Sequence, residues 1–311
     1  MEQQERRNSR LLPTPWHNAV AGGVAGAVSR ISTAPLDVAK IRCQLDGGKA
    51  SPRYGSLLKT FRSVYAEEGL IGLWRGNPAA MALWIAYTAV QFGLYPLVRD
   101  ALSASRASAY ARPRQTDKFL AGAAAACVAT TCTYPLDVMR TAFAGQGVPR
   151  RHPTLRAFAA NTLHVAGVRG FYAGLSAALV QVAPQMGIAF MAYEAVKDHP
   201  PQALAAAPGL ATWWPGVAGF SAGLLSKTVV YPLDTLKKRV QARVVLSCAG
   251  DQAVAQAGNL RSAAATVWQE GAAVALYRGL VPALWKASLS AAVTFGTYEW
   301  VKQRLSDLPV G

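Results

Sequence analysis

Three basic residues stand inside stretches of the sequence that are otherwise apolar. Arg30, Lys227 and Lys286 have no acidic residue close to them in the chain. A charge in an apolar span is costly and is by default a sign of function. Snorkelling to lipid headgroups is the alternative, but it suits Arg30 and Lys227 poorly. Because bases without acidic partners bind phosphate groups well, we predict that these three residues bind a polyanion such as a phosphate ester.

A second set of charges consists of an acid and a base three residues apart, repeated three times. Each acid follows a proline by two residues. On a helix this spacing puts the acid and the base on one face, and a proline inside the helix kinks it. Three such kinks would close one end of a barrel and allow a ring of ion pairs between helices. The alternative interpretation is that these residues are ordinary exposed charges on helix surfaces. The pairs are Asp37/Lys40, Asp137/Arg140 and Asp234/Lys237, after Pro35, Pro135 and Pro232.

The elements that position these charges are long apolar stretches, each near or above the ~20 residues that cross a hydrocarbon core. Charges or prolines inside several of them favour a bundle around a water-filled cavity over single lipid-facing anchors. Small residues four apart, as in Gly22/Gly26, Gly122/Ala126 and Gly219/Gly223, would let helices approach closely. The odd stretches are 17–44, 117–143 and 214–244, and the even ones are 76–99, 175–197 and 280–304.

The sequence is a threefold repeat of about a hundred residues. The segments TAPLDVAKIRCQ, TYPLDVMRTAFA and VYPLDTLKKRVQ align with one another, and each is followed by an aromatic-Gly segment and then by YPLVR, YEAVK or YEWVK. Three motifs in the same order three times indicate three equivalent structural units. We place these repeats at 16–104, 116–200 and 214–306.

Composition narrows the class of protein. The chain has 311 residues and a formal net charge of +16, with 52% hydrophobic and 15% charged residues, against about 25% charged residues in a soluble domain. This excludes a disordered chain, and four cysteines are too few for a disulfide framework. Neither cysteines nor histidines show metal-ligand spacing, so we expect no metal and no cofactor. A large apolar globule or a membrane protein with basic loops remains.

These motifs resemble those of the mitochondrial carrier family over nearly the whole chain. The second repeat departs from the pattern, with Ala142, Ala166 and Ala173 at positions that are charged in the family. The resemblance implies an all-α membrane protein with six transmembrane helices in a threefold pseudo-symmetric barrel, and short matrix helices. The motif residues are Pro35, Asp37, Lys40, Arg42, Glu68, Gly69, Trp74, Arg75 and Gly76 in repeat one, and Pro232, Asp234, Lys237, Arg239, Glu270, Gly271, Tyr277, Arg278 and Gly279 in repeat three.

The resemblance also implies two gates. In the matrix gate the pairs run Asp37–Arg140, Asp137–Lys237 and Asp234–Lys40, braced by Gln44 and Gln241, while Ala144 leaves the third brace missing. In the cytoplasmic gate Pro96 replaces one acid, so only Glu194–Lys302 and Glu299–Arg99 can form across helices. Pairs near water contribute about 0–1 kcal/mol each, so this thinner ring should open more easily. The cytoplasmic gate residues are Arg99, Glu194, Lys197, Glu299 and Lys302.

A small asymmetric solute needs contacts at positions where the three repeats disagree. One group of such positions lies five residues before the prolines and includes Arg30 and Lys227. A second group lies on the even stretches, where the resemblance places the family's substrate contact points. Trp84 and Tyr87 could stack on a ring, and an aromatic face attracts a cation, although such residues are often packing or interface anchors. The expected substrate-binding residues are Arg30, Leu83, Trp84, Tyr87, Gln181, Val182, Gln185, Lys227 and Lys286.

A diphosphate joined to an aromatic ring and a positive thiazolium fits this set, so thiamine pyrophosphate is the expected transported substrate. The segment AYTAVQFGLY also looks like the corresponding helix of family members that carry it. A coenzyme A or adenine nucleotide carrier is the alternative, and a proton-leak uncoupling protein is a weaker one.

The resemblance implies a multi-pass protein of the mitochondrial inner membrane that exchanges solutes by alternating access. The first ten residues lack an apolar core, so a targeting signal would be internal. The basic residues cluster between the odd and even stretches, as membrane topology would arrange them, which disfavours a nucleic-acid binder. No nucleophile-base set, metal cluster or phosphate-binding Gly loop is apparent, so we expect no enzyme. Membrane lipids are the expected surroundings, and we expect a monomer.

Overall fold

The computed structural model describes residues 15–45, 54, 56–104, 115–147, 152–197, 199, 214–247, 265 and 272–306. Its regular elements in these ranges are all helical, in agreement with the expected all-α fold. At 1.5 Å per residue even the shortest of the six long helices, with 23 residues, spans about 35 Å, more than a hydrocarbon core of about 30 Å. The long helices are α2 (Pro15–Leu45), α4 (Asn77–Ala104), α5 (Gln115–Gly145), α7 (Leu175–Lys197), α10 (Trp214–Ser247) and α13 (Leu280–Ser306); the shorter ones are α3 (Leu57–Gly72), α6 (Leu155–Gly170) and α12 (Ala272–Tyr277).

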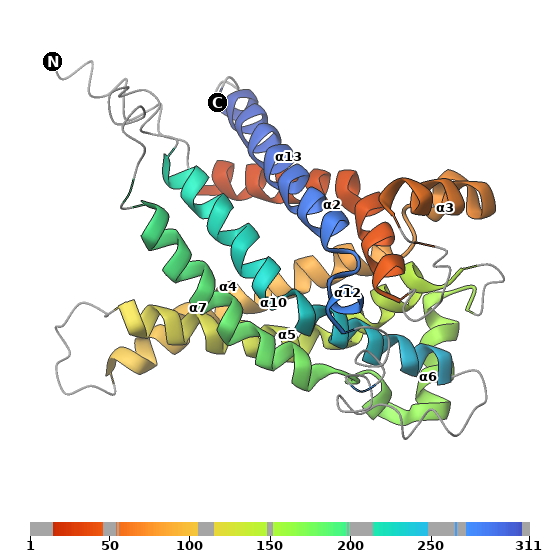
Figure 1. The fold of residues 1–311 in the computed structure, drawn as a ribbon. Coiled ribbons are helices and arrows are strands. Elements are labelled where there is room, and N and C mark those ends of the chain that lie inside the picture. Colours follow the sequence, from red (N-terminus) through yellow and green to blue (C-terminus); the bar gives the residue numbers. More distant parts are fainter. Residues whose placement is uncertain are drawn as a thin grey trace, which may run out of the picture.

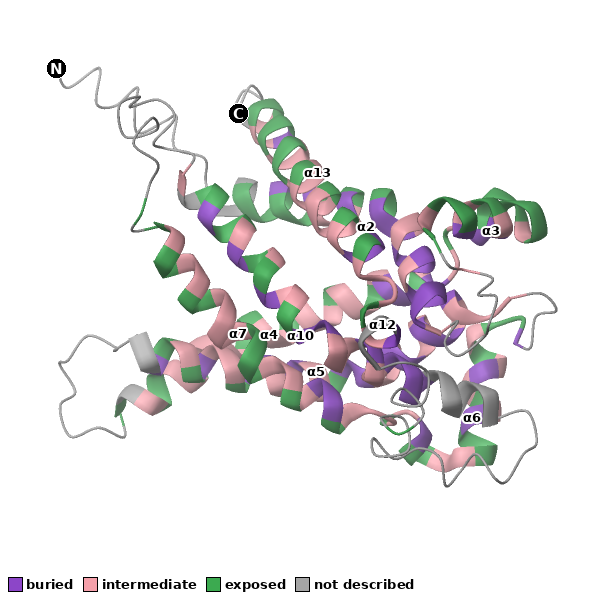
Figure 2. Cartoon of the chain, viewed as in Figure 1, coloured by how far each residue is buried: buried purple, intermediate pink, exposed green. Residues whose placement is uncertain are grey.

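The long helices form a bundle that is closed at one end and splayed at the other (Figure 1). The most extensive contacts join helices of different repeats, namely α2 with α13, α4 with α5, and α7 with α10. The buried residues gather where the long helices converge, close to the short helices, as Figure 2 shows. The closed end is therefore the packed core of the molecule.

Three of the long helices are apolar enough along their length to cross a membrane by composition alone. Within the described ranges these spans are Asn77–Leu102, Asp117–Gly145 and Leu175–Lys197. The other long helices are α2, α10 and α13, which carry Arg30, Lys227 and Lys286. Their charges face an internal cavity lined by all three bases, which is where intramembrane charges are tolerated.

The glycine that ends each aromatic-Gly motif allows the start of each even helix to pack closely against the odd helix of the next repeat. Gly76, Gly174 and Gly279 have φ values of +78°, +82° and +85°, which residues with a Cβ atom rarely adopt. A Cβ atom on Gly76 would lie 2.9 Å from the carbonyl oxygen of Arg140, and the other two glycines meet the carbonyl oxygens of Lys237 and Lys40 in the same way. Each even helix therefore begins against the odd helix of the next repeat, beside a base of the expected matrix gate.

The alanines of the second repeat mark the loss of one complete ion cluster. In repeat one the side chain of Glu68 is fully buried and pairs with Arg42 at 2.6 Å and with Arg75. Their counterparts in repeat two are Ala142, Ala166 and Ala173. A buried charge without its partner is costly, so the three substitutions make sense together.

An apolar cluster occupies the corresponding end of repeat two. Ala142 packs there with Phe158, Tyr134, Val138 and Ala178, all of them buried. Replacing a buried ion cluster by well-packed apolar side chains is often neutral or stabilising. In repeat three, Glu270 and Gly271 lie outside the described residues.

The prediction that small residues bring helices together is wrong at most of its positions. Among the described residues, a Cβ atom on Gly22, Gly122, Gly219 or Gly223 would meet nothing within 4 Å outside its own helix. Gly219 and Gly223 line a cavity instead. Gly26 makes room for a side chain, because a Cβ atom there would lie 2.3 Å from the Trp84 ring.

Candidate functional site: a central cavity above a closed ring of ion pairs

The three acid-base pairs expected at the matrix gate are formed between helices. Arg140 Nη2 donates to Asp37 Oδ2 at 2.6 Å, Lys237 Nζ lies 2.7 Å from Asp137 Oδ2, and Lys40 Nζ lies 2.5 Å from Asp234 Oδ2. The pairs link α2 to α5, α5 to α10 and α10 to α2. This ring closes the packed end of the bundle.

The two expected glutamine braces also contact the ring. Gln44 Nε2 donates to Asp234 Oδ2 at 3.2 Å, and Gln241 Nε2 donates to Asp137 Oδ2 at 3.0 Å. Both glutamines are fully buried. Hydrogen bonds to a charged group are worth about 1.5–3 kcal/mol, so each brace stabilises its ion pair.

A fourth base, Lys238, joins the ring at Asp137, and the sequence did not predict it. The buried Lys238 donates to Asp137 Oδ1 at 3.0 Å, to Thr141 Oγ1 at 2.7 Å and to Gln241 Oε1 at 3.1 Å. Its counterparts in the other repeats are Ile41 and Thr141. Comparison of the three repeats at this position would have singled it out, because only repeat three places a charge there.

Lys286 is also part of the ring, which corrects its description as a base without an acidic partner. Its Nζ atom donates to Asp37 Oδ1, while Arg140 holds the other oxygen of the same carboxylate. Asp37 lies far from Lys286 in sequence, so spacing along the chain could not reveal the contact. Asp37 is also the acid whose glutamine brace is missing, because Ala144 occupies that position. Lys286 supplies the second contact that glutamine supplies elsewhere.

The expected cytoplasmic gate residues lie at the splayed end and contact their own helices. Arg99 pairs with the adjacent Asp100 at 2.8 Å, Lys197 lies over the ring of Tyr193, and Lys302 over that of Tyr298. No ion pair joins Glu194 to Lys302 or Glu299 to Arg99, four residues that the structure describes. The structure therefore has this ring of ion pairs closed and the opposite end open.

Three adjoining cavities lie between the ring and the open end. The wide cavity has a volume of about 510 Å³, the basic cavity about 370 Å³ and the gate cavity about 190 Å³. Lys227 lines both the wide and the basic cavity, Arg30 both the basic and the gate cavity, and Tyr87 both the wide and the gate cavity. Shared walls make these spaces one central site.

Most of the residues predicted to bind substrate line this central site. Arg30, Lys227 and Lys286 line the basic cavity together. Gln181 is the exception, since it lines none of the three cavities and donates to Gln185 at 3.4 Å. The gate cavity is lined by Arg30, Leu83, Trp84 and Tyr87, and the wide cavity by Tyr87, Val182, Gln185 and Lys227.

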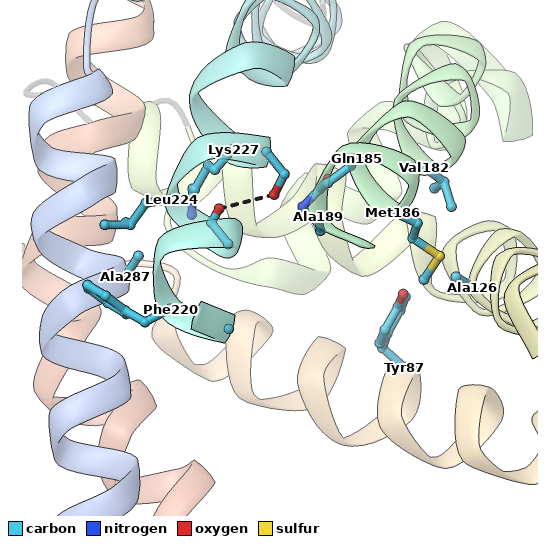
Figure 3. Close-up of a pocket in the computed structure, with 13 residues that line it drawn as sticks. Tyr87, Ala126, Val182, Gln185, Met186, Ala189, Phe220, Leu224, Lys227 and Ala287 are labelled. Atoms are coloured by element: carbon cyan, nitrogen blue, oxygen red, sulfur yellow. Dashed lines mark hydrogen bonds between the residues drawn. The ribbon is translucent and has the colours of Figure 1, made fainter. Parts of the chain in front are cut away.

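The wide cavity extends across the bundle. Figure 3 shows Tyr87 and Met186 pointing toward each other on one side, and Phe220 with Leu224 beside Ala287 of α13 on the other. Met186 and Phe220 were not among the predicted contacts. The cavity thus combines an apolar wall with a few polar groups, as small-molecule sites usually do.

Comparison with known proteins identifies the architecture. A model of the mitochondrial carrier protein family matches residues 12–106, 112–202 and 210–308. The chain belongs to the mitochondrial carrier family. The three matches agree with the threefold repeat, and the closed ring and central cavity are those of a solute transporter.

Curated relatives in plants and fungi cover almost the whole carrier. The mitochondrial thiamine diphosphate carrier 1 of Arabidopsis thaliana is 34% identical over 315 residues, which is 91% of this chain and 92% of that protein. The mitochondrial thiamine pyrophosphate carrier 1 of Aspergillus oryzae is 38% identical over 309 residues, or 94% of this chain and 93% of that one. The protein of the same name from Coccidioides immitis is 37% identical over 300 residues, or 93% and 92%.

Proposed function

We propose that this carrier transports thiamine pyrophosphate across the mitochondrial inner membrane, by exchange for another phosphorylated solute through alternating access. The convergence of Arg30, Lys227 and Lys286 on one cavity above a closed ring carries the proposal. Three cations can neutralise a diphosphate, and the names of the plant and fungal relatives support this choice among phosphate esters.

Alternating access supplies the mechanism. The solute enters from the open end, binds in the central site, and leaves after the matrix ring opens and the cytoplasmic gate closes. Of the three bases, Lys286 is bound to Asp37 of the ring in the present conformation. A diphosphate that binds Lys286 competes with Asp37 for it, so binding weakens one contact of the ring.

Uptake into liposomes tests the function. The purified carrier, reconstituted with internal thiamine pyrophosphate, should take up labelled external thiamine pyrophosphate, and empty liposomes should not. Each of Arg30→Ala, Lys227→Ala and Lys286→Ala should weaken binding by roughly tenfold to hundredfold, because each removes a charged hydrogen bond of about 1.5–3 kcal/mol. The measured quantity is the substrate concentration at half-maximal uptake.

Arg62→Ala is the matched control, because it removes an exposed base on α3 that lines none of the three cavities. It should leave uptake unchanged. If all three cavity variants transport normally, the binding site is misplaced. If the wild type moves coenzyme A or ADP and ignores thiamine pyrophosphate, the proposed substrate is wrong.

A further inference from the structure

Phe220 is a large aromatic residue at a position where the other two repeats have very small residues. It lies twelve residues before Pro232, and the residues twelve before Pro35 and Pro135 are Gly23 and Ala123. A threefold scaffold does not need a phenyl ring at this position. A solute without threefold symmetry requires contacts at such places.

The ring of Phe220 lies in the wall of the wide cavity. Phe220, Leu224 and Lys227 are spaced four and then three residues apart on α10 and line the same cavity, so they form one stripe of the helix. Figure 3 shows the Phe220 side chain directed toward α13, beside Ala287. Phe220 lines the wide cavity and keeps 40% of its surface exposed, so a solute in this cavity can reach its side chain.

The wide cavity joins the basic cavity at Lys227 and Ala287. Seven residues separate Phe220 from Lys227, a rise of about 10 Å along the helix axis. A molecule with its diphosphate on Arg30 and Lys227 can therefore extend toward Phe220 without leaving the central site. No acidic residue lines the wide cavity in the part of the chain that the structure describes, so no carboxylate competes there for a cationic ring.

We infer that Phe220 is a specificity-determining residue whose ring receives the positively charged heteroaromatic ring of the transported diphosphate ester. This deepens the proposed function and rests on it. Every diphosphate is attracted to the bases of the basic cavity, so this attraction does not distinguish one diphosphate from another. An aromatic side chain binds esters that carry a ring better than those that do not, and it favours a cationic ring. Phe220 thus separates thiamine pyrophosphate from inorganic pyrophosphate.

The test compares ring-bearing and ring-free diphosphates as competitors of labelled thiamine pyrophosphate uptake. Phe220→Ala should raise the half-inhibitory concentration of thiamine pyrophosphate roughly threefold to thirtyfold, the range of a lost cation–π contact. That of inorganic pyrophosphate should change less than about twofold, because its binding groups remain. Phe220→Leu, which keeps apolar bulk and removes the aromatic face, should behave like Phe220→Ala.

Phe92→Ala is the matched control. Phe92 is 71% exposed on α4 and lines none of the three cavities, so its removal should leave both concentrations unchanged. Equal shifts for thiamine pyrophosphate and pyrophosphate in Phe220→Ala would overturn the inference, because a packing role affects both alike. If Phe220→Leu keeps the wild-type preference for thiamine pyrophosphate over inorganic pyrophosphate, the aromatic face of Phe220 is not what binds the ring.

A binding assay separates failure of this inference from failure of the proposed function. The thermal stabilisation of the detergent-solubilised carrier is measured with thiamine pyrophosphate, ADP and inorganic pyrophosphate. If the wild type binds ADP and not thiamine pyrophosphate, the proposed function fails. Loss of the preference for ADP over pyrophosphate in Phe220→Ala would then support Phe220 as a ring contact, and an unchanged preference would overturn it.

Discussion

The closed ring of ion pairs is built differently at two of its corners, each corner being one aspartate with its partners, namely at Asp137 and at Asp37. Asp137 contacts two lysines of α10, Lys237 and Lys238, and also the glutamine brace Gln241. Asp37 contacts Arg140 of α5 and Lys286 of α13, and Ala144 stands where a brace would be. Asp137 and Lys237 line the gate cavity directly, whereas Asp37 meets the basic cavity through its contact with Lys286.

Aromatic packing also differs between the Asp137 corner and the Asp37 corner. The Tyr134 hydroxyl donates to the carbonyl oxygen of Ala173 at 3.0 Å, and Lys237 lies over the Tyr134 ring, 5.2 Å from its centroid. Repeat one has Ala34 at the position of Tyr134. A cavity of about 10 Å³ lies there instead, between Asp37, Arg140 and Ala144. The Asp37 corner is therefore less packed, and Lys286 connects it to the substrate site.

The largest expected effect is at the Asp137 corner. Asp137→Asn leaves Lys237 and the buried Lys238 without their carboxylate, and breaking a buried pair costs about 3–5 kcal/mol. The temperature of half-unfolding in detergent should fall by about 6 °C or more. Asp234→Asn is the comparison, because Lys40 is the one base that pairs with Asp234 among the described residues. If the temperature of half-unfolding falls more in Asp234→Asn than in Asp137→Asn, Asp137 is not the more strongly held aspartate of the ring.

Charge exchange gives a smaller and sharper test. Asp37→Lys combined with Arg140→Asp restores an ion pair but places the new lysine in direct contact with Lys286. Asp234→Lys with Lys40→Asp creates no such direct contact, because Lys40 is the one base that pairs with Asp234 among the described residues. In thermal unfolding, the favourable coupling at the Asp37 corner should be smaller by about 1–3 kcal/mol. Adding Lys286→Gln should recover the difference. Equal coupling at the two corners would show that Lys286 does not act on Asp37 in the closed state.

The sequence predicted the symmetric part of this molecule, because repetition reveals it. The repeated acids and bases and the odd and even helices follow from residues that recur at equivalent positions, whereas the pairing order and both glutamine braces were implied by the resemblance to the carrier family. The contacts that break the symmetry depend on distance in space. Lys286 and Asp37 lie at opposite ends of the sequence, so only the packing of α13 against α2 brings them together.

Lys238 and Phe220 were missed for a different reason. Both occupy positions where the three repeats differ, for example Ile41, Thr141 and Lys238 at equivalent positions. Neither residue lies five positions before a kink proline or on an even helix, where the substrate contacts were expected. Sequence comparison alone could have found these two residues. It could not have shown that Lys238 contacts Asp137 or that Phe220 faces the wide cavity, because both depend on how α10 packs.

The smallest expected effect comes from adding the missing brace. Ala144→Gln places an amide beside Asp37 and Arg140, where the small cavity provides part of the room. A hydrogen bond to a charged group stabilises by about 1.5–3 kcal/mol, and crowding in this packed region costs about 1–3 kcal/mol. The two contributions largely cancel, so the unfolding free energy should change by less than about 2 kcal/mol. Uptake should slow, because the closed ring of ion pairs is held more firmly.

Ala144→Leu separates the two contributions, because leucine adds similar bulk without an amide. The glutamine variant should unfold at a higher temperature than the leucine variant and take up substrate more slowly than the wild type. Combining Ala144→Gln with Lys286→Gln should then cost less stability than Lys286→Gln costs alone, because the new amide replaces the contact that Lys286 gives Asp37. If the brace does not lessen the effect of losing Lys286, the two side chains do not serve the same carboxylate.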